Sequence, residues 1–325
     1  MAEWLVEEGI GEHRAIRLTK DGIEEARVQW PGAQLVVGEV ADAILRQRLG
    51  EGSAGLVEFP NGQQAFGTLI PRRISIGALV RMRVTREAIA ERGRLKLAQA
   101  RHCEADARPA LSLAEALREE GHDVEITRRF PASADWDELW LDAARQQVDF
   151  HGGALLFAET PAMTLIDVDG GPDRAIWSNA IPVMARALKR FDLGGNIGID
   201  FPTVQDKSDR KVIDARLEEC LQEWPHERTA MNGFGLVQIV ARLERPSLLH
   251  RIARHRAAAS ARLLLRRAEA VEGAGAILLT CHPAVAAELK PEWLTELARR
   301  TGREVRIEPN PGLALEAPHA QIVTR

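Results

Sequence analysis

The sequence predicts a multidomain protein of mixed α+β and α/β class, and three patterns in its 325 residues lead to this prediction. Short apolar runs separated by glycines fill residues 35–100, which is typical of a small barrel of strands. Two apolar strands flank one amphipathic helix between residues 163 and 201, which indicates a parallel strand–helix–strand unit. Helices and strands alternate again over residues 251–325, which indicates a separate small α/β domain.

The amino-terminal part is expected to contain strands only. Residues 1–34 should hold a pair of strands that pack on the core of the protein, before a break at Trp30-Pro31-Gly32. Residues 35–100 should form an inserted OB-fold barrel, because short strands recur there between glycine-rich turns. The predicted strands of these two segments are 3–8, 12–17, 35–40, 54–59, 64–70 and 78–84.

The remaining elements follow from helical periodicity and from turn residues. Residues 101–150 contain two predicted helices, at 112–118 and 136–146, with a strand between them. A mixed α/β core is expected over residues 151–250. The domain at residues 251–325 should begin with a basic amphipathic helix, because alanine, arginine and leucine recur there at helical spacing.

Composition and charge are those of an ordinary globular chain, with a hydrophobic fraction of 45% and a charged fraction of 28%. The net charge of −4 argues against a protein that coats nucleic acid through bulk charge, yet seven arginines and no acidic residue between 245 and 267 leave room for a local basic track. No apolar run approaches membrane-spanning length and residues 1–20 lack a signal-peptide pattern, so we expect a cytoplasmic protein without membrane contacts. The three cysteines are too scattered for a metal clip or a disulfide framework.

The central strand–helix–strand unit ends both of its strands on aspartate. Asp167 and Asp169 follow the first apolar run, and Asp200 ends the second. The intervening helix stops at Gly194-Gly195. Because parallel strands joined by one helix lie side by side, we expect Asp167 and Asp200 to meet at the carboxyl edge of the sheet.

Two converging carboxylates require a cation between them, or a proton on one of them. Oxygen ligands of this kind suit Mg²⁺, with Mn²⁺ as the alternative. Such an ion can activate a water and neutralise charge on a phosphodiester. The alternative for either aspartate by itself is a capping role, because aspartate is common at strand ends. Taken together, Asp167 and Asp200 predict a divalent-metal site.

These residues and others around them resemble the ribonuclease E/G family in order and spacing. The segments that carry the resemblance are residues 155–160, Ile166-Asp167-Val168, Arg190-Phe-Asp-Leu-Gly-Gly195, Ile199-Asp200-Phe201, Phe234-Gly235-Leu236 and Arg245-Pro-Ser-Leu248. The likeness is strongest over residues 150–250, and a weaker likeness covers most of the rest. It implies a catalytic core of RNase H-like and DNase I-like mixed α/β structure at 151–250, a reduced RNase H-like and sensor region at 101–150, and an S1-type RNA-binding barrel at 35–100.

The resemblance implies a magnesium-dependent endoribonuclease that hydrolyses single-stranded RNA to 5′-phosphate and 3′-hydroxyl ends, in RNA processing or decay. On this interpretation Asp167 and Asp200 hold the metal. Asp169 is a third catalytic residue at a position where the family has an asparagine. An ionised aspartate can ligate a metal or accept a hydrogen bond but cannot donate one. The alternative for Asp169 is a turn residue before Gly170-Gly171.

Three further positions are implied to contact RNA. Phe66 matches an aromatic of the family's barrel face that anchors a base, although a place in the barrel core is an equal alternative. Arg92 keeps a positive charge where the family has a lysine that reaches RNA. Arg245 begins the basic track that would hold phosphates.

The chain also departs from the family pattern. Leu56 occupies the second aromatic position of the barrel, Gly233 replaces an arginine, and Gln238 replaces a glutamate. The cysteines of the family's zinc clip are missing, so we expect no structural zinc, and any homo-oligomer would use another surface. Too little chain remains between 101 and 150 for a full 5′-end sensor.

These departures keep a second hypothesis open, namely a catalytically impaired RNA-binding protein on the same scaffold. A phosphohydrolase acting on a small molecule is a third hypothesis.

Overall fold

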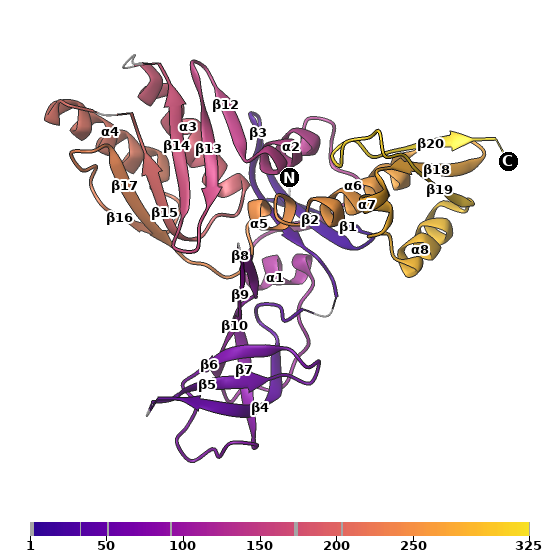
Figure 1. Cartoon of the computed structure of the whole chain (residues 1–325), viewed down its shortest axis with the longest axis horizontal. Coiled ribbons are helices and arrows are strands. Elements are labelled where there is room, and N and C mark those ends of the chain that lie inside the picture. The colour runs from indigo at the N-terminus through magenta and orange to yellow at the C-terminus, as the bar shows by residue number, and fades with distance from the viewer. Residues whose placement is uncertain are drawn as a thin grey trace.

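The computed structural model describes residues 3–32, 34–50, 52–91, 93–171, 175–202 and 204–324. Figure 1 shows a barrel below the centre of the molecule, a strand-rich body on one side and a small carboxy-terminal body on the other. None of the described helices combines the length and the hydropathy that a membrane span requires.

The amino-terminal sheet has four strands, in the order β11-β1-β2-β3. Their bounds are β1 Trp4–Gly9, β2 Glu12–Thr19, β3 Gly22–Gln29 and β11 Val124–Ile126. The prediction of a pair of strands was therefore incomplete, because β3 was missed. A register shift between Arg17 and Leu18 sets β3 against β2. The buried residues of β3 are Ile23, Ala26 and Val28, and this uneven spacing hides the period of two that marks a strand.

Helix α1 (Leu113–Glu119), which the sequence predicted at residues 112–118, packs on this sheet. Ser112 and Glu115 form a capping box at its start, in which each side chain binds the backbone N–H of the other residue. The buried side chains of Leu117, Trp4 and Val6 make the shared core.

The inserted segment forms a closed barrel in the order β10-β6-β5-β4-β7. The strands are β4 Val40–Leu49, β5 Ala54–Glu58, β6 Gln64–Thr68, β7 Leu79–Arg86 and β10 Ala98–His102. This closed five-stranded barrel is consistent with the predicted OB-like insertion. The predicted strand at 35–40 was wrong. Leu35 lies outside the barrel strands and is buried in the barrel core.

A mixed sheet of six strands forms the strand-rich body, in the order β12-β13-β14-β15-β17-β16. The strands are β12 Gln147–Phe150, β13 Gly153–Glu159, β14 Thr164–Gly170, β15 Gly195–Asp200, β16 His226–Arg228 and β17 Leu236–Ala241. β14 and β15 pair in parallel and are joined by α3 (Ala175–Arg190), as predicted. One face of the sheet packs on α3 in the largest core of the protein. Helices α2 (Trp136–Arg145) and α4 (Lys207–Leu221) complete this part.

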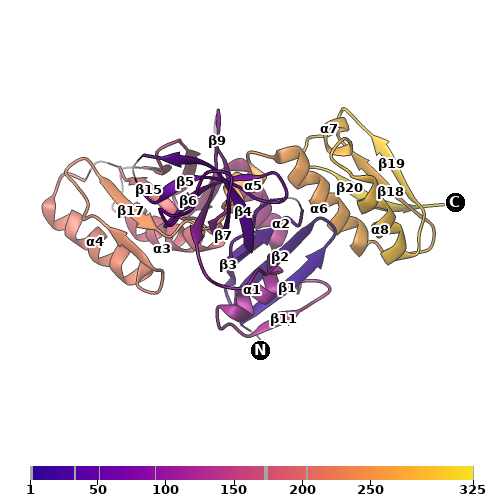
Figure 2. The same ribbon diagram turned by 90° about the horizontal axis from the view of Figure 1, so that it is seen from below.

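The carboxy-terminal domain is a three-stranded sheet in the order β19-β18-β20, covered by helices. Its elements are α6 Arg256–Ala270, β18 Ala276–Cys281, α7 Pro283–Ala286, α8 Pro291–Thr301, β19 Val305–Pro309 and β20 His319–Val323. Helix α5 (Leu248–Ile252) precedes this domain and is buried in the core of the six-stranded sheet. The predicted basic helix is α6, whose apolar residues enter a core of their own with β18. Figure 2 shows α6 beside the amino-terminal strands β1 and β2. The short ribbon of β8 (Ile89–Glu91) and β9 (Arg94–Lys96) connects the barrel strands β7 and β10.

Candidate active site

Asp167 and Asp200 are directly opposite each other on the parallel strands β14 and β15. Neighbouring strands lie about 4.8 Å apart, so the two carboxylates leave the sheet side by side. Both residues are exposed, whereas Ile166, Val168 and Ile199 between and beside them are buried against α3. The adjacency that the sequence predicted is therefore found in the structure.

Asp169 shares this exposed face, because residues two apart on a strand point to the same side. It lies one step beyond Asp167 along β14, opposite Ala154 of β13. The three sequence-predicted aspartates thus form one acidic edge. Asp167 and Asp200 are directly paired, and Asp169 flanks them.

The carboxylates of the acidic edge repel one another. The pKa of Asp167 is raised above its usual value by partial burial, and the charges of Asp200 and Asp169 raise it further. Carboxylates that raise one another's pKa favour a bound cation or a shared proton. The donor set therefore fits a hard divalent ion such as Mg²⁺, which needs only one or two protein carboxylates together with water and substrate phosphate. Over the described ranges, no group of three or more His, Cys, Asp or Glu side chains is arranged to hold a metal ion.

Gly198 leaves the sheet surface beside the acidic edge free of a side chain. Gly198 of β15 pairs with Leu165 of β14, one step behind the two aspartates. A Cβ added at Gly198 would approach Leu165 Cδ2 to 2.9 Å and Met163 Sδ to 3.0 Å. A side chain there would have to displace both neighbours. The glycine thus leaves the surface behind Asp167 and Asp200 flat and partly apolar.

The barrel residues that were predicted to contact RNA lie on the outside of the barrel. Phe66 is half-buried on the outer face of β6 and is not among the residues of the barrel core. Its neighbours on the same face are Leu56 of β5 and Gln99 of β10. The two positions at which the family resemblance placed base-stacking side chains are therefore adjacent. Their role in RNA binding stays a prediction.

The structure places only one of the two arginines that were predicted to contact RNA. Arg92 lies outside the described residues. Arg245 is half-buried, and its guanidinium lies 3.6 Å from Asp192 and 2.9 Å from Glu244. These acidic neighbours raise the pKa of Arg245 although burial opposes them. Its charge is thus already engaged within the protein, and a contact with RNA stays a prediction.

Of the two substituted positions, Gly233 lies in the turn before β17 and Gln238 lies within β17. The same turn carries Phe234, which the sequence analysis named as part of the resemblance but not as a functional residue. Gly233 is exposed, and a Cβ there would meet no atom within 4 Å. Gln238 lies on the same sheet face as Asp200, opposite Gly198. Phe234 follows Gly233 and is 84% exposed. In the sequence, Phe234 stands directly before Gly235, which indicates a turn but does not predict that the ring is exposed.

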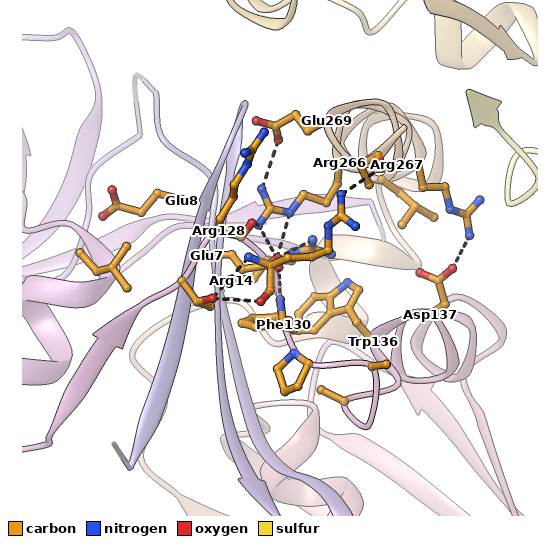
Figure 3. Close-up of a pocket in the computed structure, with 18 of the residues that line it drawn as sticks. Glu7, Glu8, Arg14, Arg128, Phe130, Trp136, Asp137, Arg266, Arg267 and Glu269 are labelled. Atoms are coloured by element: carbon orange, nitrogen blue, oxygen red, sulfur yellow. Dashed lines mark hydrogen bonds and ion pairs between the residues drawn. The ribbon is translucent and has the colours of Figure 1, made fainter. Parts of the chain in front are cut away.

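A second group of charged residues lines a hollow of about 880 Å³ between the amino-terminal sheet and the carboxy-terminal domain (Figure 3). Glu7 is only 2% exposed, and its carboxylate accepts hydrogen bonds from Arg14 Nη2 at 2.7 Å and Arg266 Nε at 2.9 Å. The backbone N–H of Phe130 donates to the other oxygen at 2.6 Å. Arg14 also lies 4.7 Å above the ring of Trp136. These contacts join β1, β2 and α6 and lie outside the acidic edge.

Known proteins support the resemblance. The profile described as "Ribonuclease E/G family" matches residues 113–242, the part of the chain that contains β14, α3 and β15. Ribonuclease G of Escherichia coli (strain K12) and that of Salmonella typhimurium (strain SL1344) are each 27% identical to the chain over 190 residues. The matches cover 49% of this chain and 39% of each relative, so the chain spans about two fifths of the length of the curated relatives it matches. The part of the chain that is similar to the ribonuclease E/G family, residues 113–242, holds both paired aspartates.

Proposed function

We propose that this protein is a metal-dependent endoribonuclease that cuts single-stranded RNA and leaves 5′-phosphate and 3′-hydroxyl ends. The observation that carries the proposal is the direct pairing of Asp167 with Asp200 on neighbouring parallel strands of an exposed sheet face. The similarity of residues 113–242 to the ribonuclease E/G family supports RNA as the substrate class. The relatives named ribonuclease G support the same class of activity.

In this proposal Asp167 and Asp200 hold one Mg²⁺, with Mn²⁺ as a substitute. The bound ion would neutralise charge on the scissile phosphodiester and lower the pKa of a water molecule. Asp169 adds a third negative charge to the edge and can accept a hydrogen bond from a water on the same face. The flat surface left by Gly198 allows an extended RNA strand to lie close to the two carboxylates.

The barrel and the basic residues would supply binding rather than chemistry. Single-stranded RNA is recognised by stacking its splayed bases and by holding its phosphates. We assign the first role to Phe66 and the second to Arg92 and Arg245. The same proposal includes three further predictions. The core has RNase H-like and DNase I-like structure, the protein is cytoplasmic, and it forms a homo-oligomer.

Cleavage of a short single-stranded RNA that carries a fluorophore and a quencher tests the proposal. Internal cuts are expected in Mg²⁺ or Mn²⁺ and none in EDTA. Asp167→Asn and Asp200→Asn should each lower the cleavage rate by about 100-fold or more, because the ion's charge stabilisation is lost with its ligand. The matched control is Asp106→Asn, an exposed aspartate in the segment that follows the barrel, which should cleave as the wild type does.

A non-catalytic RNA-binding protein is the second candidate, and the substitutions at Asp169, Gly233 and Gln238 favour it. It predicts RNA binding without cuts in either metal. Turnover of phosphomonoesters without RNA cleavage would instead favour a small-molecule phosphohydrolase. Either result would contradict the endoribonuclease.

A further inference from the structure

Phe234 differs from every other aromatic residue of this protein. The chain has eight phenylalanines, seven tryptophans and no tyrosine, and the structure describes all of them. Phe234 is the one among these that is exposed, with 84% of its surface open to solvent. The other aromatic rings are buried or half-buried. An exposed phenylalanine gains nothing from folding, so its position requires a different explanation.

The backbone that carries Phe234 is held in place. The Asn232 side-chain oxygen accepts hydrogen bonds from the N–H groups of Phe234 at 2.9 Å and of Leu236 at 3.1 Å. Gly235 has φ +90°, and a Cβ at this residue would lie 2.6 Å from the carbonyl oxygen of Phe201. The Gly235 carbonyl in turn accepts the N–H of Phe201 at 3.2 Å. The ring is therefore presented by an ordered turn, which reduces the entropy lost when something binds to it.

This turn lies at the acidic edge. Phe201 directly follows Asp200, and Leu236 is the cross-strand partner of Asp200. Phe234 is thus two residues from the partner of a proposed metal ligand. Leu236 is itself 37% exposed on the same sheet face as Asp200, so an apolar surface continues from the turn toward the carboxylates.

We propose that the Phe234 ring stacks on a base of the RNA strand, next to the phosphodiester that faces Asp167 and Asp200. This inference rests on the proposed function and adds a positioning residue to it. Stacking on an aromatic ring holds a nucleotide in place and tolerates every base, because each base has a flat π-face. A phenylalanine ring has no hydrogen-bonding group, so the contact would orient the strand without selecting a sequence. The backbone phosphate is then fixed relative to Asp200 through the ordered turn.

The test combines variants of Phe234 with an abasic scan of the substrate. A fluorescent single-stranded RNA with one mapped cut is prepared in versions that lack one base at a time but keep every ribose and phosphate. Phe234→Ala should lower kcat/KM on the intact RNA by about 5- to 150-fold. Phe234→Trp should stay within about threefold of the wild type, because it keeps a stacking surface. Val212→Ala, an equally simple loss of an exposed apolar side chain on α4 (68% exposed), should change nothing.

The abasic scan supplies a readout that a structural role would not give. For the wild type, one abasic position next to the cut should lower kcat/KM by the same factor as Phe234→Ala. For Phe234→Ala, removing that base should have no further effect, because the two changes delete the same contact. Losses that multiply at every position, or an unchanged kcat/KM for Phe234→Ala, would overturn the inference while leaving the proposed function intact.

Failure of the proposed function gives a different result. If the wild type does not cut RNA in Mg²⁺ or Mn²⁺, the proposed nuclease activity is excluded. The affinity of the wild type and of Phe234→Ala for each abasic RNA, measured by fluorescence anisotropy, then tests the stacking contact. Removal of the contacted base should weaken binding by the wild type and leave binding by Phe234→Ala unchanged. Sedimentation velocity of the wild type and Phe234→Ala gives the last check. Conversion of a dimer to a monomer by the substitution would mean that a second copy of the chain covers the ring, and would overturn the inference.

Discussion

Asp167 and Asp200 place like charges directly opposite each other on neighbouring strands, and in the metal-free protein this pairing opposes folding. Like charges at opposed cross-strand positions destabilise a sheet by roughly 0.2–1 kcal/mol. Asp200→Asn should therefore raise the melting temperature of the metal-free protein, by up to about 3 °C. The substitution should also abolish the further rise that Mg²⁺ gives the wild type. Differential scanning fluorimetry in EDTA and in Mg²⁺ measures both effects.

Asp106→Asn serves as the control for this measurement, because Asp106 is an exposed aspartate that lies outside the strands and therefore has no cross-strand neighbour. A lower melting temperature for metal-free Asp200→Asn would mean that the carboxylate stabilises the fold. In that case Asp200 would have a structural role at the end of β15.

Gly233 stands where the resemblance to the ribonuclease E/G family implies an arginine, and a substitution there tests whether a positive charge at this position binds RNA. Open space surrounds the position at which its Cβ would stand, so a long side chain there is sterically tolerated. Gly233→Arg should tighten binding of single-stranded RNA several-fold and make the dependence of log K on log salt steeper by about 0.7, the value for one added phosphate contact. Gly233→Gln, of similar length but neutral, is the matched control. An equal gain for both substitutions would show that charge is not the cause.

The sequence anticipated those elements whose signals are local, and it missed those that depend on distant partners. Helical periodicity and glycine stops gave α1 and α3 correctly, and the apolar runs of β14 and β15 gave the correct parallel pair. Strand β3 was missed because a register shift disturbs its alternation. The first barrel strand was misplaced because Leu35 fills the barrel core from outside the strands.

The same contrast holds for the candidate site. The adjacency of Asp167 and Asp200 follows from strand–helix–strand topology, so the sequence could predict it. The exposure of Phe234 depends on how its turn meets the chain at Phe201, which no local pattern encodes. The engagement of Arg245 by Asp192 and Glu244 likewise depends on tertiary packing.

Helix α5 carries a histidine that should make folding sensitive to acid. His250 Nδ1 lies 2.8 Å from Ser247 Oγ, at the helix start, and 3.0 Å from Glu159 Oε1 of β13. Burial lowers the pKa of His250 from 6.5 to about 4. The charges of Arg254, Lys96 and Arg251 act in the same direction, and Glu91 opposes them. Because the unfolded chain takes up this proton more readily, the neutral form stabilises the fold above pH 6.5, and this stabilisation is lost as the pH falls toward 4.

His250→Asn keeps a hydrogen-bonding group near Ser247 but does not titrate. Between pH 6.5 and 4 the variant's free energy of unfolding should fall less steeply than that of the wild type, by up to about 1.4 kcal/mol per pH unit. Urea denaturation at several pH values measures the slope. Glu159, whose pKa is raised by burial, changes stability in the opposite direction in both proteins, so the difference isolates His250. Parallel slopes for the two proteins would contradict the assignment.

At the scale of the whole molecule, a buried ion-pair cluster joins the amino-terminal sheet to the carboxy-terminal domain. Glu7 of β1 binds Arg14 of the neighbouring strand β2 and Arg266 of α6, which is far away in the sequence (Figure 3). Sequence patterns gave no indication of this cluster, because Arg266 comes from α6, which only the tertiary fold brings to β1 and β2. The contacts fix how α6, and with it the carboxy-terminal domain, lies against β1.

Glu7→Gln should destabilise the protein by about 3 kcal/mol, because it removes the shared anion of the buried Arg14 and the half-buried Arg266. Guanidinium chloride denaturation measures the loss, and limited proteolysis shows whether the carboxy-terminal domain is released first. The control is Glu8→Gln, the exposed neighbour on the same strand, which should change stability by less than about 0.5 kcal/mol. Similar effects for both substitutions would show that the cluster does not join the two parts.

The account depends most on the claim that Asp167 and Asp200 bind one divalent ion between them. Electron paramagnetic resonance of added Mn²⁺ measures this without reference to catalysis, because free Mn²⁺ gives a strong signal that binding diminishes. One Mn²⁺ should bind per chain in the wild type and in Asp106→Asn, and this binding should be lost in Asp167→Asn and in Asp200→Asn. Equal Mn²⁺ binding by the wild type and by both active-site variants would contradict the account.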